Sequence, residues 1–286
     1  MTAPTPSFRV RVDVTNPGQF FACCGLLELA DRAAQNAMGK FLKCEKGFVF
    51  EVSVAGNYSP AALLSDLSKC TITSSLALGE IARLRTLLNT KKTNLSPEAT
   101  AEKKKLTKKW NSERIQIGPP FNLLLDWWMD KALKTWAGKQ FITDIIDGVF
   151  RPFRENKWTA GQLEELFALE INDGSLPFYF DAAIGGHSSS ADVGFGLDAL
   201  SIRSKIKPAI EFLALIGLQR FKPARIGDTF HYRVWKQDLP PLLAAALSSG
   251  GYDSGEFTQF AFPLLYRTEY LKAFLSAKPK PKSQKL

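Results

Sequence analysis

A half-buried strand followed at once by a buried helix is the pattern that most restricts the fold of this chain. Apolar and polar side chains alternate over residues 8–14, with Arg9 and Arg11 on the polar side, which is the period of a strand that has one face in water. Residues 16–19 supply a capping asparagine, a proline suited to the first helical position and a glutamine placed as a capping-box partner. The apolar run that follows predicts a buried helix over about 20–33.

Further strands predict the fold class. Residues 48–54 alternate like the first strand, and strand, helix, strand is the first half of a ferredoxin-like unit, which is common in RNA-binding modules. We therefore predict an α+β fold with ferredoxin-like, RRM-type sheet elements and inserted helices. Helical sequence is also expected over 60–90 and, ended by Gly217, over about 206–216. The remaining predicted strands are 176–183, 229–235 and 256–264.

The composition indicates a globular chain, and the spacing of its cysteines and histidines indicates no bound cofactor. With 286 residues and 45% hydrophobic composition, we predict one α+β unit over residues 1–277. The longest apolar run, residues 20–27, is too short for a membrane span, and the N-terminus lacks the pattern of a signal peptide. We expect a cytoplasmic protein with no membrane partner.

The four cysteines lack paired CxxC spacing and both histidines are distant from them, so we predict neither a metal nor any other cofactor.

The net charge of +9 resides in two segments. Residues 91–114 carry eight basic and three acidic side chains, and residues 278–286 carry four lysines and no acid. We predict a basic helical insertion at about 91–118 and a disordered basic tail over 278–286. A neutral body with two cationic segments favours a polyanionic partner, although charges of this kind can also serve solubility alone.

The basic insertion contains a helix with clear start signals. Ser96, Pro97 and Glu98 provide a cap, a first-turn proline and a first-turn acid. An apolar strip predicts one packed face, and lysines cover the rest. The residues predicted to contact phosphates are Lys103, Lys104, Lys105, Lys108, Lys109 and Arg114, joined by Arg9 and Arg11 on the first strand.

A glycine- and serine-rich segment at 185–192 is the sharpest local feature. Such a turn can present backbone N–H groups to a phosphate, but it lacks the pattern of a nucleotide-binding P-loop. A flexible connection explains the composition equally well. Together with the basic segment 219–225, it is our candidate for reading DNA. The predicted contact residues are Gly186, His187, Ser188, Ser189, Gln219, Arg220, Lys222 and Arg225.

Two further sets of residues bear on function. Aromatic residues alternate with basic ones between 121 and 158, which suits base stacking, but we expect most of the tryptophans to pack in the core. The chain has only His187 and His231 for acid/base catalysis, and the carboxylates between 126 and 147 form only loose pairs. We therefore predict no enzymatic activity.

Two parts of the sequence resemble a known family. They are FRVRVDVTNPGQFFACCGLLELADR at 8–32, and the 185–200 loop together with FLALIGLQRFKPAR at 212–225. These segments are similar to a family encoded in type I-U (I-G) CRISPR operons, a divergent large subunit of the Cascade surveillance complex. The resemblance covers the two ends better than residues 80–175, and the chain is short for a large subunit.

The resemblance implies a non-catalytic subunit of a crRNA-guided complex. Base pairing with the guide would read the target, while this chain would recognise the short flanking motif and help to open the duplex. The implied partners are crRNA, target double-stranded DNA, the Cascade backbone subunits and a helicase-nuclease. Two alternatives stay open: a metal-independent repeat RNA endonuclease using His187 or His231, and a scaffold subunit without DNA contact.

Overall fold

The computed structural model describes residues 7–45, 47–155, 163–185, 205–253, 255–266 and 272–281. Its mixture of helices and small antiparallel sheets confirms the predicted α+β class. Within these ranges, no helix combines the length and apolar character that crossing a membrane requires. The predicted contact residues Gly186, His187, Ser188 and Ser189 lie outside the described residues.

The N-terminal strand and helix form as the sequence predicts. Phe8, Val10 and Val12 are buried, whereas Arg9 and Arg11 are exposed. The Asn16 side chain caps the helix by accepting a hydrogen bond from the Gly18 N–H at 3.0 Å. The Gln19 side chain accepts a hydrogen bond from the Asp13 N–H at 2.8 Å. A capping box would instead use the backbone N–H of the N-cap residue, Asn16. The elements are β1 (Phe8–Val12) and α1 (Pro17–Ala34).

The first sheet contains a strand that the sequence did not predict. β2 (Met38–Cys44) forms a hairpin with β3 (Gly47–Ser53), and the antiparallel order is β1-β3-β2. The strand, helix and two strands agree with the start of a ferredoxin-like unit. In the described part of the chain this sheet has three strands, so the ferredoxin-like detail stays a prediction.

Two glycines bring α1 against α9 (Pro208–Arg220) at the centre of the molecule. A Cβ atom on Gly25 would lie 2.0 Å from the Leu213 carbonyl oxygen, and one on Gly217 would lie 2.0 Å from that of Phe21. The prediction that the helix over about 206–216 ends at Gly217 is therefore wrong. The helix continues to Arg220 because this glycine serves close packing between helices, not termination.

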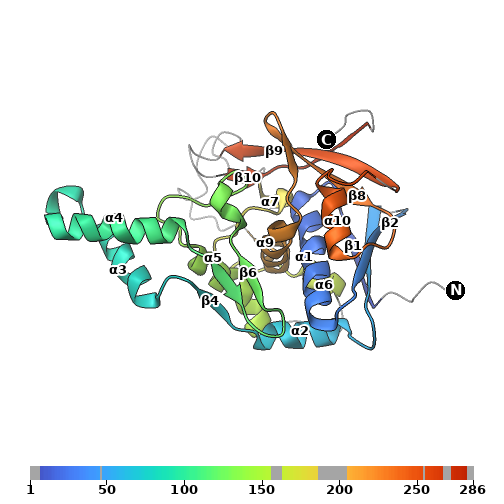
Figure 1. The fold of residues 1–286 in the computed structure, drawn as a ribbon, viewed down its shortest axis with the longest axis horizontal. Helices are drawn as coiled ribbons and strands as arrows, with labels where there is room; N and C mark the ends of the chain where they lie inside the picture. The colour runs from blue at the N-terminus through green and yellow to red at the C-terminus, as the bar shows by residue number, and fades with distance from the viewer. Residues whose placement is uncertain are drawn as a thin grey trace.

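The C-terminal sheet lies beside these helices (Figure 1). Its path is β10-β9-β8-β7, and β11 also pairs with β9. The prediction for 229–235 is confirmed by β8, but residues 176–183 form no strand. A bridge between Gly39 and Leu239 connects β2 to the segment after β8. The elements are β7 (Ala224–Ile226), β8 (Thr229–Trp235), α10 (Pro241–Ser248), β9 (Phe257–Tyr266), β10 (Lys272–Phe274) and β11 (Lys278–Lys280).

A helical hairpin projects from a third sheet at one end of the molecule (Figure 1). Ser74 pairs with Ile115 across the base of the hairpin, so the insertion spans 75–114, not about 91–118. The expected helical region 60–90 divides into two helices with β4 between them. The elements are α2 (Pro60–Lys69), β4 (Ile72–Ser74), α3 (Leu78–Asn89), η1 (Lys92–Asn94), α4 (Pro97–Asn111), β5 (Ile115–Ile117) and β6 (Leu123–Leu125).

The middle of the chain packs its aromatic residues into the core. Trp127, Trp128 and Trp136 are 3–4% exposed and contact one another edge to face, which confirms the core interpretation for these three. A single buried cluster includes residues from Phe8 to Ala277, while the hairpin has a small cluster of its own. The remaining elements are η2 (Trp127–Asp130), α5 (Ile142–Arg154), α6 (Leu163–Ala168) and α7 (Ala182–Gly185).

Candidate nucleic-acid interface

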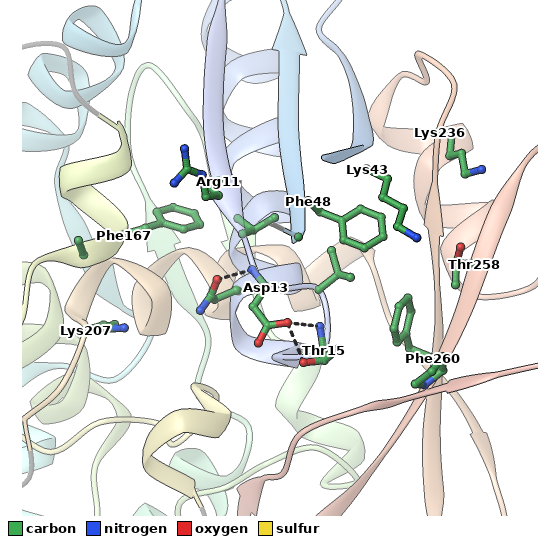
Figure 2. Close-up of a pocket in the computed structure, with 16 residues that line it drawn as sticks. Arg11, Asp13, Thr15, Lys43, Phe48, Phe167, Lys207, Lys236, Thr258 and Phe260 are labelled. Atoms are coloured by element: carbon green, nitrogen blue, oxygen red, sulfur yellow. Dashed lines mark hydrogen bonds between the residues drawn. The ribbon is translucent and has the colours of Figure 1, made fainter. Parts of the chain in front are cut away.

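A basic hollow of about 850 Å³ opens between the first sheet and the C-terminal sheet. Arg11, Lys43, Lys207 and Lys236 line it, together with a single carboxylate, Asp13. In Figure 2, Arg11 and Lys207 lie on one side of the space and Lys43 and Lys236 on the other. We refer to this site as the basic hollow. Four cations around one space make it a candidate phosphate site.

Each cation reaches the basic hollow from a different element. Arg11 is on the exposed side of β1, Lys43 is near the end of β2, Lys207 immediately precedes α9, and Lys236 follows β8. Lys236 pairs with an exposed glutamate at 2.9 Å. The other three cations have no ion-pair partner among the described residues. They are therefore available to an external anion.

The local chemistry of the basic hollow favours a polyanion with an apolar part. The Asp13 carboxylate is already engaged, because its Oδ1 accepts hydrogen bonds from the Thr15 backbone N–H and hydroxyl at 2.8 and 2.7 Å (Figure 2). The partly exposed Phe48 and the nearly buried Phe167 and Phe260 contribute aromatic lining. Aromatic surface between cations is the combination that binds nucleic acid through both its phosphates and its bases.

The basic tail begins at this same hollow. Lys278 and Lys280 belong to β11, which pairs with β9, and Pro279 between them lines the basic hollow. The predicted disorder is therefore wrong for 278–280, because strand pairing fixes the backbone; residues 282–286 lie outside the described residues. One of the two cationic segments thus adjoins the site.

The α4 helix begins at its predicted cap, but its lysines do not all face solvent. Ser96 accepts from the Ala99 N–H at 3.2 Å. Lys103 donates to the Leu87 carbonyl at the end of α3 at 2.9 Å, and Lys109 forms an ion pair with Glu80. These two lysines hold the hairpin together. Lys104, Lys105 and Lys108 are exposed and have no ion-pair partner in the described structure, and Arg114 lies 3.6 Å from Asp126.

Replacing Lys104, Lys105 and Lys108 together with alanine should weaken nucleic-acid binding to all sequences alike. Each lost phosphate contact reduces the slope of log affinity against log salt by about one. The measurement is fluorescence anisotropy with labelled duplexes over a salt series, and unchanged thermal unfolding serves as the control for folding. If the slope stays at its wild-type value, α4 does not contact phosphates.

The basic segment 219–225 is largely engaged within the fold. Gln219 accepts from the backbone N–H groups of Asp126 and Trp127 at 3.0 and 3.1 Å and donates to the Asp126 side chain. Arg220 binds both carboxylate oxygens of Glu28, at 2.6 and 3.1 Å. Neither side chain is presented freely to DNA. Lys222 and Arg225 are exposed, and Arg225 donates to the Gly227 carbonyl from β7.

Glu28 explains why Arg220 is held. Its side chain is 3% exposed and also binds Arg32 at 2.7 Å. Burial acts to raise the pKa of Glu28, but the hydrogen bonds and charges of Arg220 and Arg32 outweigh burial and hold the pKa below its ordinary value. Arg32 in turn donates to two carbonyls near β6. This pair of arginines joins α1, α9 and the third sheet through one buried carboxylate.

A buried polar cluster lies just before the glycine- and serine-rich segment. Asn16 donates to Asp181 at 2.6 Å, and the fully buried Glu211 accepts from the Asp181 and Phe180 N–H groups at 2.9 and 3.3 Å. Burial raises the pKa of Glu211 to about 8, and the Asp181 charge contributes in the same direction. Glu211 is therefore mainly protonated at neutral pH.

The free energy of unfolding should fall as the pH rises from about 4.5 to about 8 through Glu211. In this window the carboxyl ionises in the unfolded chain but stays protonated in the folded one, so the folded state binds more protons and loses stability as pH rises. Glu211→Gln should flatten this part of the profile, measured by urea unfolding. A profile that keeps the same slope in the variant would assign the pH dependence to other groups.

His231 lies on β8 within the C-terminal sheet. His231 is 3% exposed, and its Nε2 lies 2.9 Å from the Thr229 hydroxyl. Burial lowers its pKa, and the charge of Lys280 adds to this. His231 is thus packed within the fold. Among the described residues, no cluster of three or more histidine, cysteine or acidic side chains could hold a metal ion.

Only part of this candidate site is predictable from the sequence. Arg11 was predicted from strand alternation, but Lys43, Lys207 and Lys236 were missed because they are isolated along the sequence and come together only through the packing of two sheets. The tail lysines did provide a charge signal. No family, curated protein or solved structure matches the chain.

Proposed function

We propose that this protein is a non-catalytic nucleic-acid-binding subunit of a crRNA-guided type I CRISPR effector complex. The observation that supports binding best is the basic hollow, where four cations surround an aromatic-lined space of about 850 Å³ that contains one carboxylate. A site with this excess of positive over negative side chains attracts a phosphate backbone. The resemblance of residues 8–32 and 212–225 to a divergent large subunit supports the choice of complex.

In the proposed role, the chain recognises the motif that flanks the target, helps to open the duplex and recruits the helicase-nuclease. Its partners are crRNA, target double-stranded DNA and the backbone subunits. Figure 1 places α4 at one end of the molecule and the β1-β3-β2 sheet toward the other. Two basic regions at this separation can contact an extended nucleic acid at two places. Phosphate contacts of this kind fix the position of the protein on the nucleic acid, while base pairing with the guide reads the sequence.

Co-purification from the native operon tests the assembly. A tagged copy of this chain is expressed with the neighbouring genes, and the bound proteins and RNA are identified. We expect other effector subunits and crRNA in constant proportion to the chain. Recovery of the chain without RNA or partner subunits would contradict the proposal.

Crosslinking and cleavage assays separate the alternatives. In the assembled complex, target duplex should crosslink to this chain; crosslinks confined to other subunits would favour a scaffold. The purified chain should leave labelled repeat RNA intact without metal. Cleavage that disappears in His187→Ala or His231→Ala would instead support the repeat endonuclease.

A further inference from the structure

A second pocket, of about 530 Å³, lies where the helical hairpin joins the body. Three aromatic residues line it, Trp110 at the end of α4, Trp136 and Tyr266, together with Lys131, Lys134 and Lys272. No carboxylate is among its lining residues. We refer to it as the tryptophan pocket. Its residues come from the hairpin, the segment after η2 and the β9–β10 pair.

The aromatic rings of the tryptophan pocket have surface available for stacking. Trp110 stacks on Phe141, with 4.8 Å between ring centroids; this contact covers one face of a ring that also lines the pocket. Tyr266 is 60% exposed, whereas Trp136 is 4% exposed and forms part of the buried aromatic core. An exposed tyrosine beside a half-buried tryptophan forms a platform of the kind on which nucleic-acid bases stack.

The indole N–H groups provide an independent observation. Trp127, Trp128 and Trp235 each donate to a backbone carbonyl, at 2.9, 3.1 and 2.7 Å. Trp110 and Trp136, the two that line the pocket, donate no hydrogen bond within the described part of the chain. Neither indole nitrogen is among the buried side-chain atoms without a partner in the described structure. The ring nitrogens and carbonyls of a nucleobase can accept hydrogen bonds from such N–H groups.

Three lysines give the tryptophan pocket a positive charge, which Glu113 near Lys134 and Asp130 near Lys272 offset only in part. Lys134 lies over the Trp136 ring at 5.3 Å, and burial together with the charge of Lys131 lowers the pKa of Lys134. Lys272 lies over Tyr266 at 5.7 Å and donates to the Lys131 carbonyl at 3.1 Å. In the described structure, Lys131 and Lys134 have no ion-pair partner. An entering phosphate would supply the missing negative charge.

We propose that the tryptophan pocket binds one unstacked nucleotide of a single-stranded nucleic acid. The base stacks on Tyr266 and Trp110, and the adjoining phosphates contact Lys131 and Lys134. The volume accommodates a single nucleotide and falls in the range of small-molecule sites. This inference rests on the proposed nucleic-acid-binding function but uses residues outside the basic hollow.

The test compares single strands with and without bases. The full chain is titrated with labelled 12-mers of deoxythymidine and of uridine, and with an abasic deoxyribose-phosphate 12-mer that keeps the phosphates. Wild type should bind the base-containing strands about tenfold more tightly than the abasic one. Tyr266→Ala should remove most of this preference, and Tyr266→Phe should retain it. Comparable binding of the deoxythymidine and uridine strands indicates that neither the 2′-hydroxyl nor the thymine methyl group is required.

Two further variants complete the design. Tyr252→Ala removes an exposed tyrosine outside the pocket and should leave the preference intact. Lys131→Ala should weaken base-containing and abasic strands equally, because it removes only a phosphate contact. Thermal unfolding checks that each variant remains folded.

The outcomes distinguish the pocket from the wider proposal. Equal affinity of wild type for base-containing and abasic strands, or a preference that persists in Tyr266→Ala, would overturn the nucleotide pocket. If duplex DNA still binds in a salt-dependent way in that case, the proposed function stands without it. Failure of wild type to bind any nucleic acid would overturn both.

Discussion

Gly25→Ala is expected to lower the free energy of unfolding by about 3 kcal/mol, at the upper end of overpacking effects. The added Cβ atom would lie 2.0 Å from the Leu213 carbonyl oxygen and 3.1 Å from the Gly217 nitrogen. Both are backbone atoms of α9, so no side chain can rotate away to make room. The two central helices must separate, which disturbs packing on both sides of the core.

Gly79→Ala is the matched control. Gly79 is also helical, in α3, but a Cβ atom there would meet no atom within 4 Å. Alanine should therefore leave stability unchanged or raise it by about 0.5–1 kcal/mol through its better helix propensity. Urea unfolding of both variants gives the comparison. Equal stabilities for Gly25→Ala and wild type would mean that α1 and α9 do not approach as closely as described.

Arg220→Ala should lower the free energy of unfolding by about 2 kcal/mol and leave nucleic-acid affinity unchanged. The substitution deprives the buried Glu28 carboxylate of two hydrogen bonds, and breaking a buried pair from one side is costly. We place the effect below the usual 3–5 kcal/mol because Arg32 still binds Glu28.

The comparison with Arg220→Lys tests the bidentate geometry. Lysine keeps the charge but cannot form the two parallel hydrogen bonds of a guanidinium, so we expect an intermediate stability. Affinity is measured below the unfolding transition, for targets with and without the flanking motif. Loss of affinity for only the correct motif, with stability unchanged, would restore Arg220 as a DNA-reading residue.

Sequence patterns correctly predicted the helices and strands that are determined by neighbouring residues, through helix caps and the alternation of apolar and polar side chains. The alternation of residues 8–12, the caps at Asn16 and Ser96 and the apolar strand 229–235 all appear where predicted. β2 was missed because Gly39 and Lys40 interrupt its alternation, and cross-strand pairing with β3 stabilises it instead. Local propensity does not contain that information.

The candidate sites depend on contacts between distant segments. Gly217 has the same local signal whether it ends a helix or packs against another, and only the approach of α1 decides between them. Likewise, the charge of Arg220 is visible in the sequence, but its use depends on Glu28, 192 residues away. The basic hollow and the tryptophan pocket both arise from such long-range packing, so the residues that line them cannot be identified from local sequence patterns.

The salt dependence of duplex binding by Arg11→Ala/Lys43→Ala tests the central claim most directly. These two cations come from opposite sides of the basic hollow (Figure 2) and have no ion-pair partner in the described structure. The control is Lys69→Ala, an exposed lysine at the end of α2 outside the hollow. We predict that the double variant binds duplex DNA more weakly, with a slope of log affinity against log salt reduced by about two, whereas Lys69→Ala keeps the wild-type slope. A double variant with wild-type affinity and slope would contradict nucleic-acid binding at the basic hollow.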